Sequence, residues 1–369
     1  MSERYKGKKN RTADGRMLSG TAARLLMTVL LALSVLLGGC GGTGGGKSAD
    51  KTAVVHNPCG QTAMKNPGDG PYTVVDSRGD EIHFKKKPQR IMTLSMGTDQ
   101  IVLGLVKSDK LVAVSSLMDD PISSNVVPLG KKVSTKIRNP SAEQVFELQP
   151  DLVIVPDWGK PEIIHMIRQL GINVLVVDGA ENIGEIEHSI RLIADALGEP
   201  EKGTELLCMM QRKLDEITAK VAQQPDRDKK KVVLISLMTR YGGKGCIYDD
   251  MCHYAGVDNG IASAGLLNGQ ELTKEMLVKI NPDILIMPVY NDHGNFNTKE
   301  FNDSYLKDPS LQSIKAIRNK RIVYPREGYL YNSSQDAVFG IQEIARCVYG
   351  DAFDFPDNMH LSVSGEENR

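Results

Sequence analysis

The chain has 369 residues, with 45 Lys and Arg against 46 Asp and Glu, so its formal net charge is −1 at pH 7. This length favours a short leader followed by two globular lobes, or by one large domain. No block of like charge is long enough to bind a polyanion, which excludes nucleic acid as an expected partner.

The first 39 residues are typical of a bacterial signal peptide. Basic residues between positions 4 and 24 precede an apolar run at 25–37, which is too short to span the roughly 30 Å of hydrocarbon in a bilayer. The run ends in Leu37-Gly38-Gly39-Cys40, which resembles the lipobox and implies cleavage before Cys40 and acylation of its thiol. We therefore expect an extracytoplasmic protein of the bacterial cell envelope that is lipid-anchored to a membrane. The alternative is an uncleaved anchor helix.

Residues 40–70, which follow the cleavage site, are rich in Gly and polar side chains. They lack any hydrophobic period of 2 or 3.6 residues, so neither a strand nor a helix is predicted. We interpret them as a flexible tether between the lipid and the folded body.

The cysteines beyond the anchor allow two interpretations. They are Cys59, Cys208, Cys246, Cys252 and Cys347. Cys246 and Cys252 could form a disulfide if Cys246 lies in the loop before the helix that carries Cys252. Small buried or half-buried thiols are the other interpretation. No C-x-x-C is present, so a structural zinc or iron–sulfur site has no support.

The N-terminal lobe is predicted at residues 71–198. A β-hairpin at 72–84 precedes short apolar strands at 91–95, 111–115, 152–156 and 174–177, which are separated by helical segments. Apolar strands that alternate with helices indicate a parallel sheet covered on both faces.

A C-terminal lobe of the same kind is predicted at residues 225–352. Its strands lie at 232–237, 284–287 and 321–324, and its helices at 247–255, 274–280 and 335–349. The fold class is therefore α/β, with two doubly wound, Rossmann-like lobes and a ligand cleft between them. Residues 353–369 form a C-terminal tail whose role the pattern leaves open.

The two lobes contain one repeated segment. Residues 141–158 align without gaps on residues 273–290, and each copy begins with a hydroxyl residue suited to cap a helix, Ser141 or Thr273. Each copy then runs through a short helix, a Pro-Asp break and a buried strand to an aromatic residue, Trp158 or Tyr290. This repeat predicts two lobes of one plan.

A single helix is expected to join the lobes at residues 199–224, with apolar side chains at helical spacing. One helix is a stiff connector, so the lobes should rock slightly and not swing wide.

Together these features resemble the iron-complex and vitamin B12 family of periplasmic binding proteins. The resemblance covers about residues 72–350 and rests on the segments 90–95 and 254–259, on the two Pro-Asp repeats and on the inter-lobe helix. It implies transport without catalysis, no cofactor, and a ligand that is a metal complex: a ferric siderophore, haem or a corrinoid such as cobalamin. It also implies an ABC permease dimer with a cytoplasmic ATPase as the partner.

Ligands of open α/β sheets bind beyond the carboxyl ends of the strands, which selects the loops that should face the cleft. The first lobe would contribute Ser95, Met96, Gly97, Leu117 and Trp158, and the second Arg240, Tyr241, Tyr290, His293, Arg326, Tyr329 and Tyr331. The aromatic rings would stack on a large ligand, and the arginines would hold anionic oxygens. Direct ligation of haem or ferric iron is possible for Tyr241, Tyr329, Tyr331 and His293, although such residues are more often packing groups. The alternatives are aromatic rings that cap the lobe cores and arginines that lie in solvent. No histidine spacing suggests a site for a free metal ion.

Glu143 and Glu275 occupy equivalent positions in the two repeats, each in the first turn of a helix. A carboxylate there is stabilised by the helix dipole, which explains both residues without any function. The resemblance implies a second role, since the family carries paired glutamates, one on each lobe, that dock to arginines of the permease.

Two rival functions differ from transport. A lipid-anchored hydrolase should show a nucleophile elbow, and G-x-S-x-G is absent from the sequence. A lipid-anchored ligand sensor of the same fold, signalling to a membrane partner, is the remaining alternative, which a sequence pattern does not distinguish from a transporter subunit.

Overall fold

The computed structural model describes residues 65–224, 229–291 and 294–368, all of which belong to one compact unit. The predicted signal peptide, Cys40 and most of the tether lie outside these residues, as does His293. None of the helices in the described ranges combines the length and the apolar character that crossing a bilayer requires.

The first lobe is built on a parallel sheet with the order β5-β4-β3-β6-β7. The strands are β3 (Ile91–Thr93), β4 (Leu111–Ser115), β5 (Lys136–Ile137), β6 (Leu152–Pro156) and β7 (Asn173–Val177). Before them an antiparallel hairpin, β1 (Tyr72–Val75) and β2 (Glu81–Phe84), lies beside β7, where the Ser77 amide donates to the Val176 carbonyl at 3.0 Å. The four longer strands and the hairpin match the sequence prediction, whereas the two-residue β5 is too short to give a periodic signal.

Helices cover both faces of this sheet. They are α1 (Met96–Leu105), α2 (Val127–Lys132), α3 (Ala142–Glu147), α4 (Pro161–Gln169) and α5 (Ile183–Ala196), with the 3₁₀ turn η2 (Ser108–Lys110). Every residue of β6 is buried, and its side chains alternate between two clusters. Ile154 packs in the cluster that contains α1 and α5, while Val153 packs in the cluster that contains α3 and α4. A strand buried on both faces is what the continuous apolar run predicted.

The second lobe has a parallel sheet of order β11-β10-β8-β9. The strands are β8 (Lys231–Leu234), β9 (Asp258–Asn259), β10 (Ile284–Ile286) and β11 (Ile322–Val323). Around them lie α7 (Ile247–Tyr254), α8 (Gly260–Ser263), α9 (Lys274–Ile280), α10 (Thr298–Leu306), η4 (Pro309–Leu311), α11 (Lys315–Arg318), α12 (Glu327–Leu330), α13 (Ala337–Tyr349) and η5 (Asp351–Phe353). The predicted architecture of two separate α/β sheets is confirmed, while β9 was missed because two residues carry no period.

The repeated segment forms the same unit in each lobe. Ser141 caps α3 in a reciprocal capping box with Gln144, and the hydroxyl of Thr273 accepts from the Met276 amide to cap α9. Each helix leads into a strand inside its sheet, β6 in the first lobe and β10 in the second. The gapless alignment therefore corresponds to a structural repeat.

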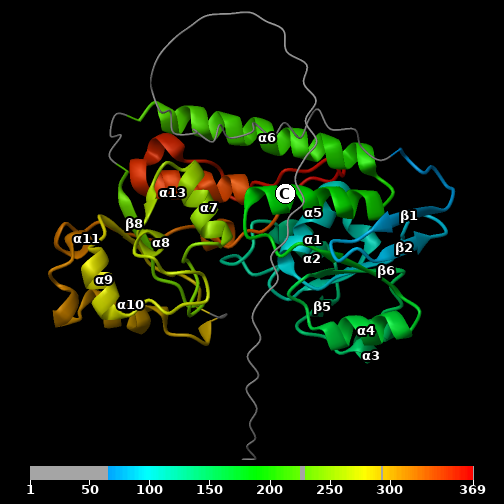
Figure 1. Cartoon of the computed structure of the whole chain (residues 1–369), viewed down its shortest axis with the longest axis horizontal. Coiled ribbons are helices and arrows are strands. Elements are labelled where there is room, and N and C mark those ends of the chain that lie inside the picture. Colours follow the sequence, from blue (N-terminus) through cyan, green and yellow to red (C-terminus); the bar gives the residue numbers. More distant parts are fainter. Residues whose placement is uncertain (1–64, 225–228, 292–293, 369) are drawn as a thin grey trace, which may run out of the picture. The chain divides into compact units, whose positions relative to one another are not determined.

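The connecting helix α6 (Pro200–Ala222) runs across both lobes (Figure 1). Its 23 residues span about 35 Å at the usual rise per residue. It contacts α1 and α5 of the first lobe and α13 of the second. The apolar residues that predicted it, from Leu206 to Ile217, face inward and are buried.

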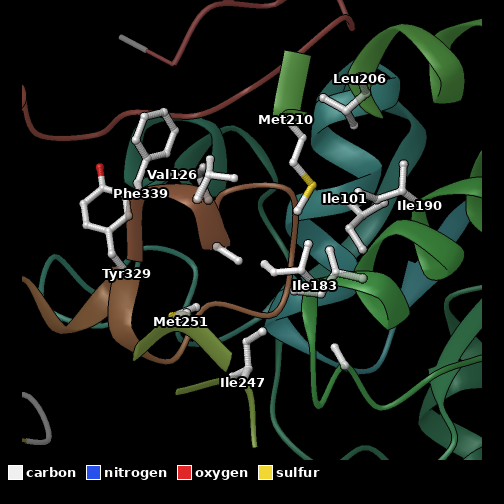
Figure 2. Close-up of a cluster of buried hydrophobic side chains, with 14 of the residues drawn as sticks. Ile101, Val126, Ile183, Ile190, Leu206, Met210, Ile247, Met251, Tyr329 and Phe339 are labelled. Atoms are coloured by element: carbon white, nitrogen blue, oxygen red, sulfur yellow. The ribbon is translucent and has the colours of Figure 1, made fainter. Parts of the chain in front are cut away.

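One hydrophobic cluster continues from lobe to lobe beneath this helix. Figure 2 shows Met210 of α6 reaching into the cluster, with Ile101 and Ile190 of the first lobe on one side and Phe339 of the second on the other. All four side chains are at most 1% exposed. Large relative motion of the lobes would open this apolar contact to water, so the packing favours the small rocking that a stiff connector predicts.

Residues 354–368, here called the C-terminal strap, return from the second lobe to the first. The Val363 amide donates to the Gly104 carbonyl at 2.7 Å. The carboxylate of Glu366 accepts from the Ser108 amide at 2.7 Å and from Lys132 Nζ at 2.9 Å. The chain therefore crosses between the lobes a second time, which the tail's polar sequence did not reveal.

The thiols of Cys246, Cys252 and Cys347 are free and buried, while Cys208 is disulfide-bonded. Cys246 and Cys252 therefore do not pair, and the interpretation of small buried thiols holds for them. The Cys246 thiol instead donates to the Gly243 carbonyl at 3.1 Å. Burial raises the pKa of Cys347 to about 12, which keeps this thiol protonated.

Candidate functional site

A cavity of about 540 Å³ is lined by residues of both lobes. Its lining from the first lobe follows the ends of β3, β4, β5 and β6, and its lining from the second follows β8, β10 and β11. Both sheets thus present their carboxyl edges to one space, which is where α/β sheets bind ligands. The volume lies in the range of small-molecule sites.

Seven of the twelve residues predicted to bind the ligand line this cavity. They are Ser95, Met96, Gly97, Leu117, Trp158, Tyr290 and Tyr331. Ser95 also caps α1, since its hydroxyl accepts from the Thr98 amide at 3.2 Å. At Gly97 the lobes come close, because a Cβ atom there would lie 2.2 Å from Ser333 Oγ of the second lobe.

The repeat-equivalent aromatic residues Trp158 and Tyr290 lie on opposite lobes of the cavity. The Trp158 side chain is 67% exposed, so it does not cap the core of its lobe. Tyr290 is half-buried, and its amide donates to Oε2 of Glu327 at 2.6 Å. Two flat rings, one from each lobe, suit a large ligand with an apolar face.

Arg326 and Tyr329 are absent from the cavity lining, contrary to their predicted place in the site. Nε and Nη2 of Arg326 donate to Glu343 at 2.9 and 2.7 Å, and its guanidinium lies 3.7 Å from the centre of the Phe355 ring. Glu343 is completely buried, and a buried carboxylate requires a cation. The hydroxyl oxygen of Tyr329 accepts from the Met359 amide at 2.7 Å, so this ring holds the C-terminal strap.

Arg240 and Tyr241 also do not line the cavity. Arg240 is exposed and has a positive φ of 72° in the loop after β8. The Tyr241 ring lies behind Tyr331, with 5.2 Å between the ring centroids, and burial holds the pKa of its hydroxyl well above the ordinary value. The loop follows its strand as predicted, but the Arg240 side chain points into solvent and the Tyr241 side chain points into the protein.

The cavity contains polar residues that sequence reasoning missed, above all Gln100, Arg138 and Glu327. Gln100 lies within α1 and Glu327 begins the four-residue helix α12, so neither follows a strand directly. Arg138 follows β5, the short strand that the pattern did not predict. A correct prediction of β5 would have pointed to Arg138, whereas no local signal marks the other two.

Glu327 is a buried acid, 5% exposed, at the boundary of the cavity. Burial raises its pKa above the ordinary value, against hydrogen bonds from the backbone amides of Tyr290 and Val289. Arg138, by contrast, is exposed. Nowhere in the described ranges, the cavity included, is a group of three or more His, Cys, Asp or Glu residues placed to hold a metal ion.

Glu143 and Glu275 are both exposed, on the first turns of α3 and α9. Hydrogen bonding to the Ser141 side chain and to its own amide lowers the pKa of Glu143, and its own amide and the Thr273 side chain do the same for Glu275. Asn139 and Pro140, just before α3, line the cavity, so the start of this helix lies at the cavity rim. In Figure 1 both helices lie away from α6.

The fold and the inter-lobe cavity define a binding protein with two lobes, and the sequence comparison agrees. Residues 91–327 match the periplasmic binding protein family, so the chain belongs to this family, as predicted. It is a substrate-binding protein of an ABC transporter, and its family is extracytoplasmic.

One relative is the uncharacterised ABC transporter substrate-binding lipoprotein YvrC of Bacillus subtilis. It is 26% identical over 340 residues, which cover 89% of this chain and 98% of the relative. A cobalamin-binding protein of Halobacterium salinarum is 24% identical over 228 residues, or 60% of each chain. Both are named as binding proteins, in accord with the expectation that the family transports and does not catalyse.

Solved structures share the fold. The apo haem-binding protein RhuT of Roseiflexus has a TM-score of 0.60 and 23% identity, covering 72% of this chain and 99% of its own. CeuE of Helicobacter pylori has a TM-score of 0.61 and 21% identity, covering 77% and 90%. These likenesses confirm the predicted arrangement of two α/β lobes.

Proposed function

We propose that this protein captures a bulky metal complex, either an iron chelate such as a ferric siderophore or haem, or a corrinoid, and delivers it to an ABC permease dimer. The observation that carries the proposal is the cavity between the carboxyl edges of the two sheets, to which each lobe contributes an aromatic residue, Trp158 or Tyr290. Haem-binding and cobalamin-binding proteins among the relatives support this class of ligand.

The proposal includes the parts of the chain that precede the lobes. Residues 1–39 would be removed as a signal peptide, Cys40 would carry the lipid, and the segment to residue 70 would tether the lobes to the membrane. The lobes at 71–198 and 225–352 would bind the ligand, and the helix at 199–224 would hold them in register.

Ligand titration of the purified protein tests the proposed function directly. Haem, cyanocobalamin and a panel of ferric siderophores are added separately while the fluorescence of Trp158, the single tryptophan of the chain, is followed together with visible absorbance. We expect saturable quenching by one class of ligand, because stacking against Trp158 brings an absorbing macrocycle or chelate within contact distance. Absence of saturable binding across the whole panel would contradict the proposal.

A Trp158→Phe variant separates stacking from the optical signal. The variant keeps a flat ring at the wall but is optically silent, so its affinity is read by calorimetry. We expect affinity within a few-fold of the parent protein, and a loss of about tenfold in Trp158→Ala, which has no ring. Phe146→Ala is the matched control, since Phe146 is an exposed aromatic residue of α3 that does not line the cavity.

A further inference from the structure

The amide group of Gln100 has a fixed orientation, set by neighbours from the second lobe and the strap. Asn125 Nδ2 donates to Asp336 Oδ2 and to the Met359 carbonyl, each at 2.8 Å. Asn125 Oδ1 must therefore accept, and it does so from Asn332 Nδ2 at 3.1 Å and from Gln100 Nε2 at 2.8 Å. An Asn or Gln amide that donates with its nitrogen presents its oxygen on the other side.

Oε1 of Gln100 consequently faces away from this network as a hydrogen-bond acceptor. Gln100 is completely buried and lines the cavity. Its Oε1 atom has no hydrogen-bond partner among the described residues. Because a buried acceptor without a donor is unfavourable, this atom defines a place where a bound ligand can donate.

Glu327 supplies a second acceptor in the same cavity. Its Oε2 accepts from the Tyr290 amide at 2.6 Å, and a carboxylate has lone pairs for further donors. Within the part of the chain that the structure describes, no Lys or Arg forms an ion pair with Glu327. The second lobe thus supplies a hydrogen-bond acceptor from a residue that is only 5% exposed.

Cationic groups are few at this cavity. Arg138 is the only Lys or Arg among the described residues that line it, and this side chain is exposed. Apart from Glu327, the other lining residues are uncharged, and they include apolar side chains such as Met96, Leu117 and Met238 as well as five serines. An anionic ligand would place its charge against the Glu327 carboxylate without a buried cation to compensate, which is costly.

From this arrangement we propose that the ligand is a bulky, uncharged or cationic molecule that presents hydrogen-bond donors, such as carboxamide or hydroxyl groups, to Gln100 and Glu327. The inference rests on the proposed function and narrows its ligand class. Among metal complexes of suitable size, it favours a macrocycle with carboxamide side chains over carboxylate-bearing haem or an anionic ferric catecholate.

Two corrinoids that share one ring test the inference. Dicyanocobinamide carries carboxamide side chains, and dicyanocobyrinic acid carries carboxylates in their place. Affinities are measured by Trp158 quenching, with haem and a ferric tris-catecholate as further probes. We expect the carboxamide corrinoid to bind at least about tenfold more tightly than its carboxylate counterpart, since only the former donates to both acceptors.

Other outcomes have distinct meanings. Equal or tighter binding of the carboxylate corrinoid, or binding of haem or the catecholate alone, would overturn this inference and leave the proposed function standing. Failure of every probe to bind would overturn the proposed function, and this inference with it.

Substitution of Glu327 should change the binding affinity in opposite directions for the carboxamide and the carboxylate ligand. Glu327→Gln keeps an oxygen for the Tyr290 amide but removes the charge. This variant should bind the carboxamide corrinoid about tenfold more weakly and the carboxylate corrinoid more tightly. If the protein's own ligand were an anion, the variant would bind that ligand more tightly than the parent does. Gln100→Met removes the orphan acceptor with little change in volume and should also weaken carboxamide binding about tenfold.

Controls separate binding from folding. Glu162→Gln changes the same residue type at an exposed position of α4, away from the cavity, and should leave both affinities unchanged. Each variant is compared with the parent by circular dichroism and thermal midpoint before titration. Should Glu327→Gln fail to fold, Gln100→Met carries the test alone, and unchanged carboxamide affinity in a folded Gln100→Met would overturn the role of that acceptor.

Discussion

Nδ1 of His360, in the C-terminal strap, lies 2.6 Å from Oδ2 of Asp336 in the second lobe, and both side chains are at most 1% exposed. The same oxygen of Asp336 accepts from Asn125 Nδ2 of the first lobe at 2.8 Å, and its other oxygen accepts from the Leu361 amide at 2.8 Å. One buried carboxylate therefore joins the strap to both lobes.

Loss of the His360 ring should loosen this junction. We expect His360→Ala to lower the free energy of unfolding by about 2–3 kcal/mol, because the buried carboxylate of Asp336 loses its hydrogen bond with the imidazole ring. Urea unfolding measures the change. His165→Ala, at an exposed position of α4, is the control and should stay within about 0.5 kcal/mol of the parent. Equal stability of the two variants would mean that the strap contributes nothing through this contact.

Docking to the permease should depend on the paired glutamates. We expect Glu143→Ala combined with Glu275→Ala to abolish ligand uptake in cells while ligand affinity in solution stays unchanged, since both residues are exposed. Glu147→Ala combined with Glu271→Ala removes two other exposed acids near the same helices and should transport normally. Loss of affinity together with uptake would instead indicate a folding defect.

The free energy of unfolding should depend on pH because of the buried carboxyl group of Asp99. Burial raises the pKa of this carboxyl from 3.8 to about 8, although Thr93, the Ser115 amide and Lys136 act in the opposite direction. The folded protein then holds a proton that the unfolded chain releases above pH 4. Stability from this group is present below pH 4 and is lost as the pH rises towards 8, by at most about 1.4 kcal/mol per pH unit.

An Asp99→Asn variant isolates this effect because an amide does not titrate. Between pH 5 and pH 7.5 we expect the parent to lose up to about 3 kcal/mol relative to the variant in urea unfolding. A constant difference between the two proteins over this range would show that the Asp99 carboxyl does not have a raised pKa.

Position 97 should accept only glycine without a loss of stability, because Gly97 lies close to Ser333 of the second lobe. An added Cβ would lie 2.2 Å from Ser333 Oγ and 3.0 Å from the Ser333 carbonyl oxygen. We expect Gly97→Ala to destabilise the protein by about 1–3 kcal/mol, because the lobes must shift apart. Adding Ser333→Ala removes the nearer atom and should recover part of the loss, as measured by thermal unfolding of all three variants. No recovery would locate the strain elsewhere, for example in the helical backbone of α1.

The sequence predicted most strands and the longest helices, but not the nine-residue helix α10. The all-apolar run of β6 and the spacing from Leu206 to Ile217 are local signals, because burial of each residue follows from its neighbours in the chain. The two-residue strands β5 and β9 gave no such signal.

The internal repeat extended this reasoning to the cavity. Since Trp158 and Tyr290 end equivalent segments, the sequence alone placed one aromatic ring on each lobe, and the structure brings both to one cavity. Arg326 shows the limit of the same reasoning. Its position after a strand suggested a ligand, but a buried Glu343 on the neighbouring helix takes its guanidinium.

Sequence by itself determined the order of the strands other than β5 and β9, the two-lobed plan and the family, because these follow from periods and repeats along the chain. Tertiary structure alone decided which polar groups meet. Asn125 and Asp336 are 211 residues apart, and the orientation of the Gln100 amide depends on that distant pair, because Gln100 Nε2 donates to Asn125 Oδ1. Hydrogen bonds between such residues depend on how the two lobes and the strap pack together, and no local pattern encodes that packing.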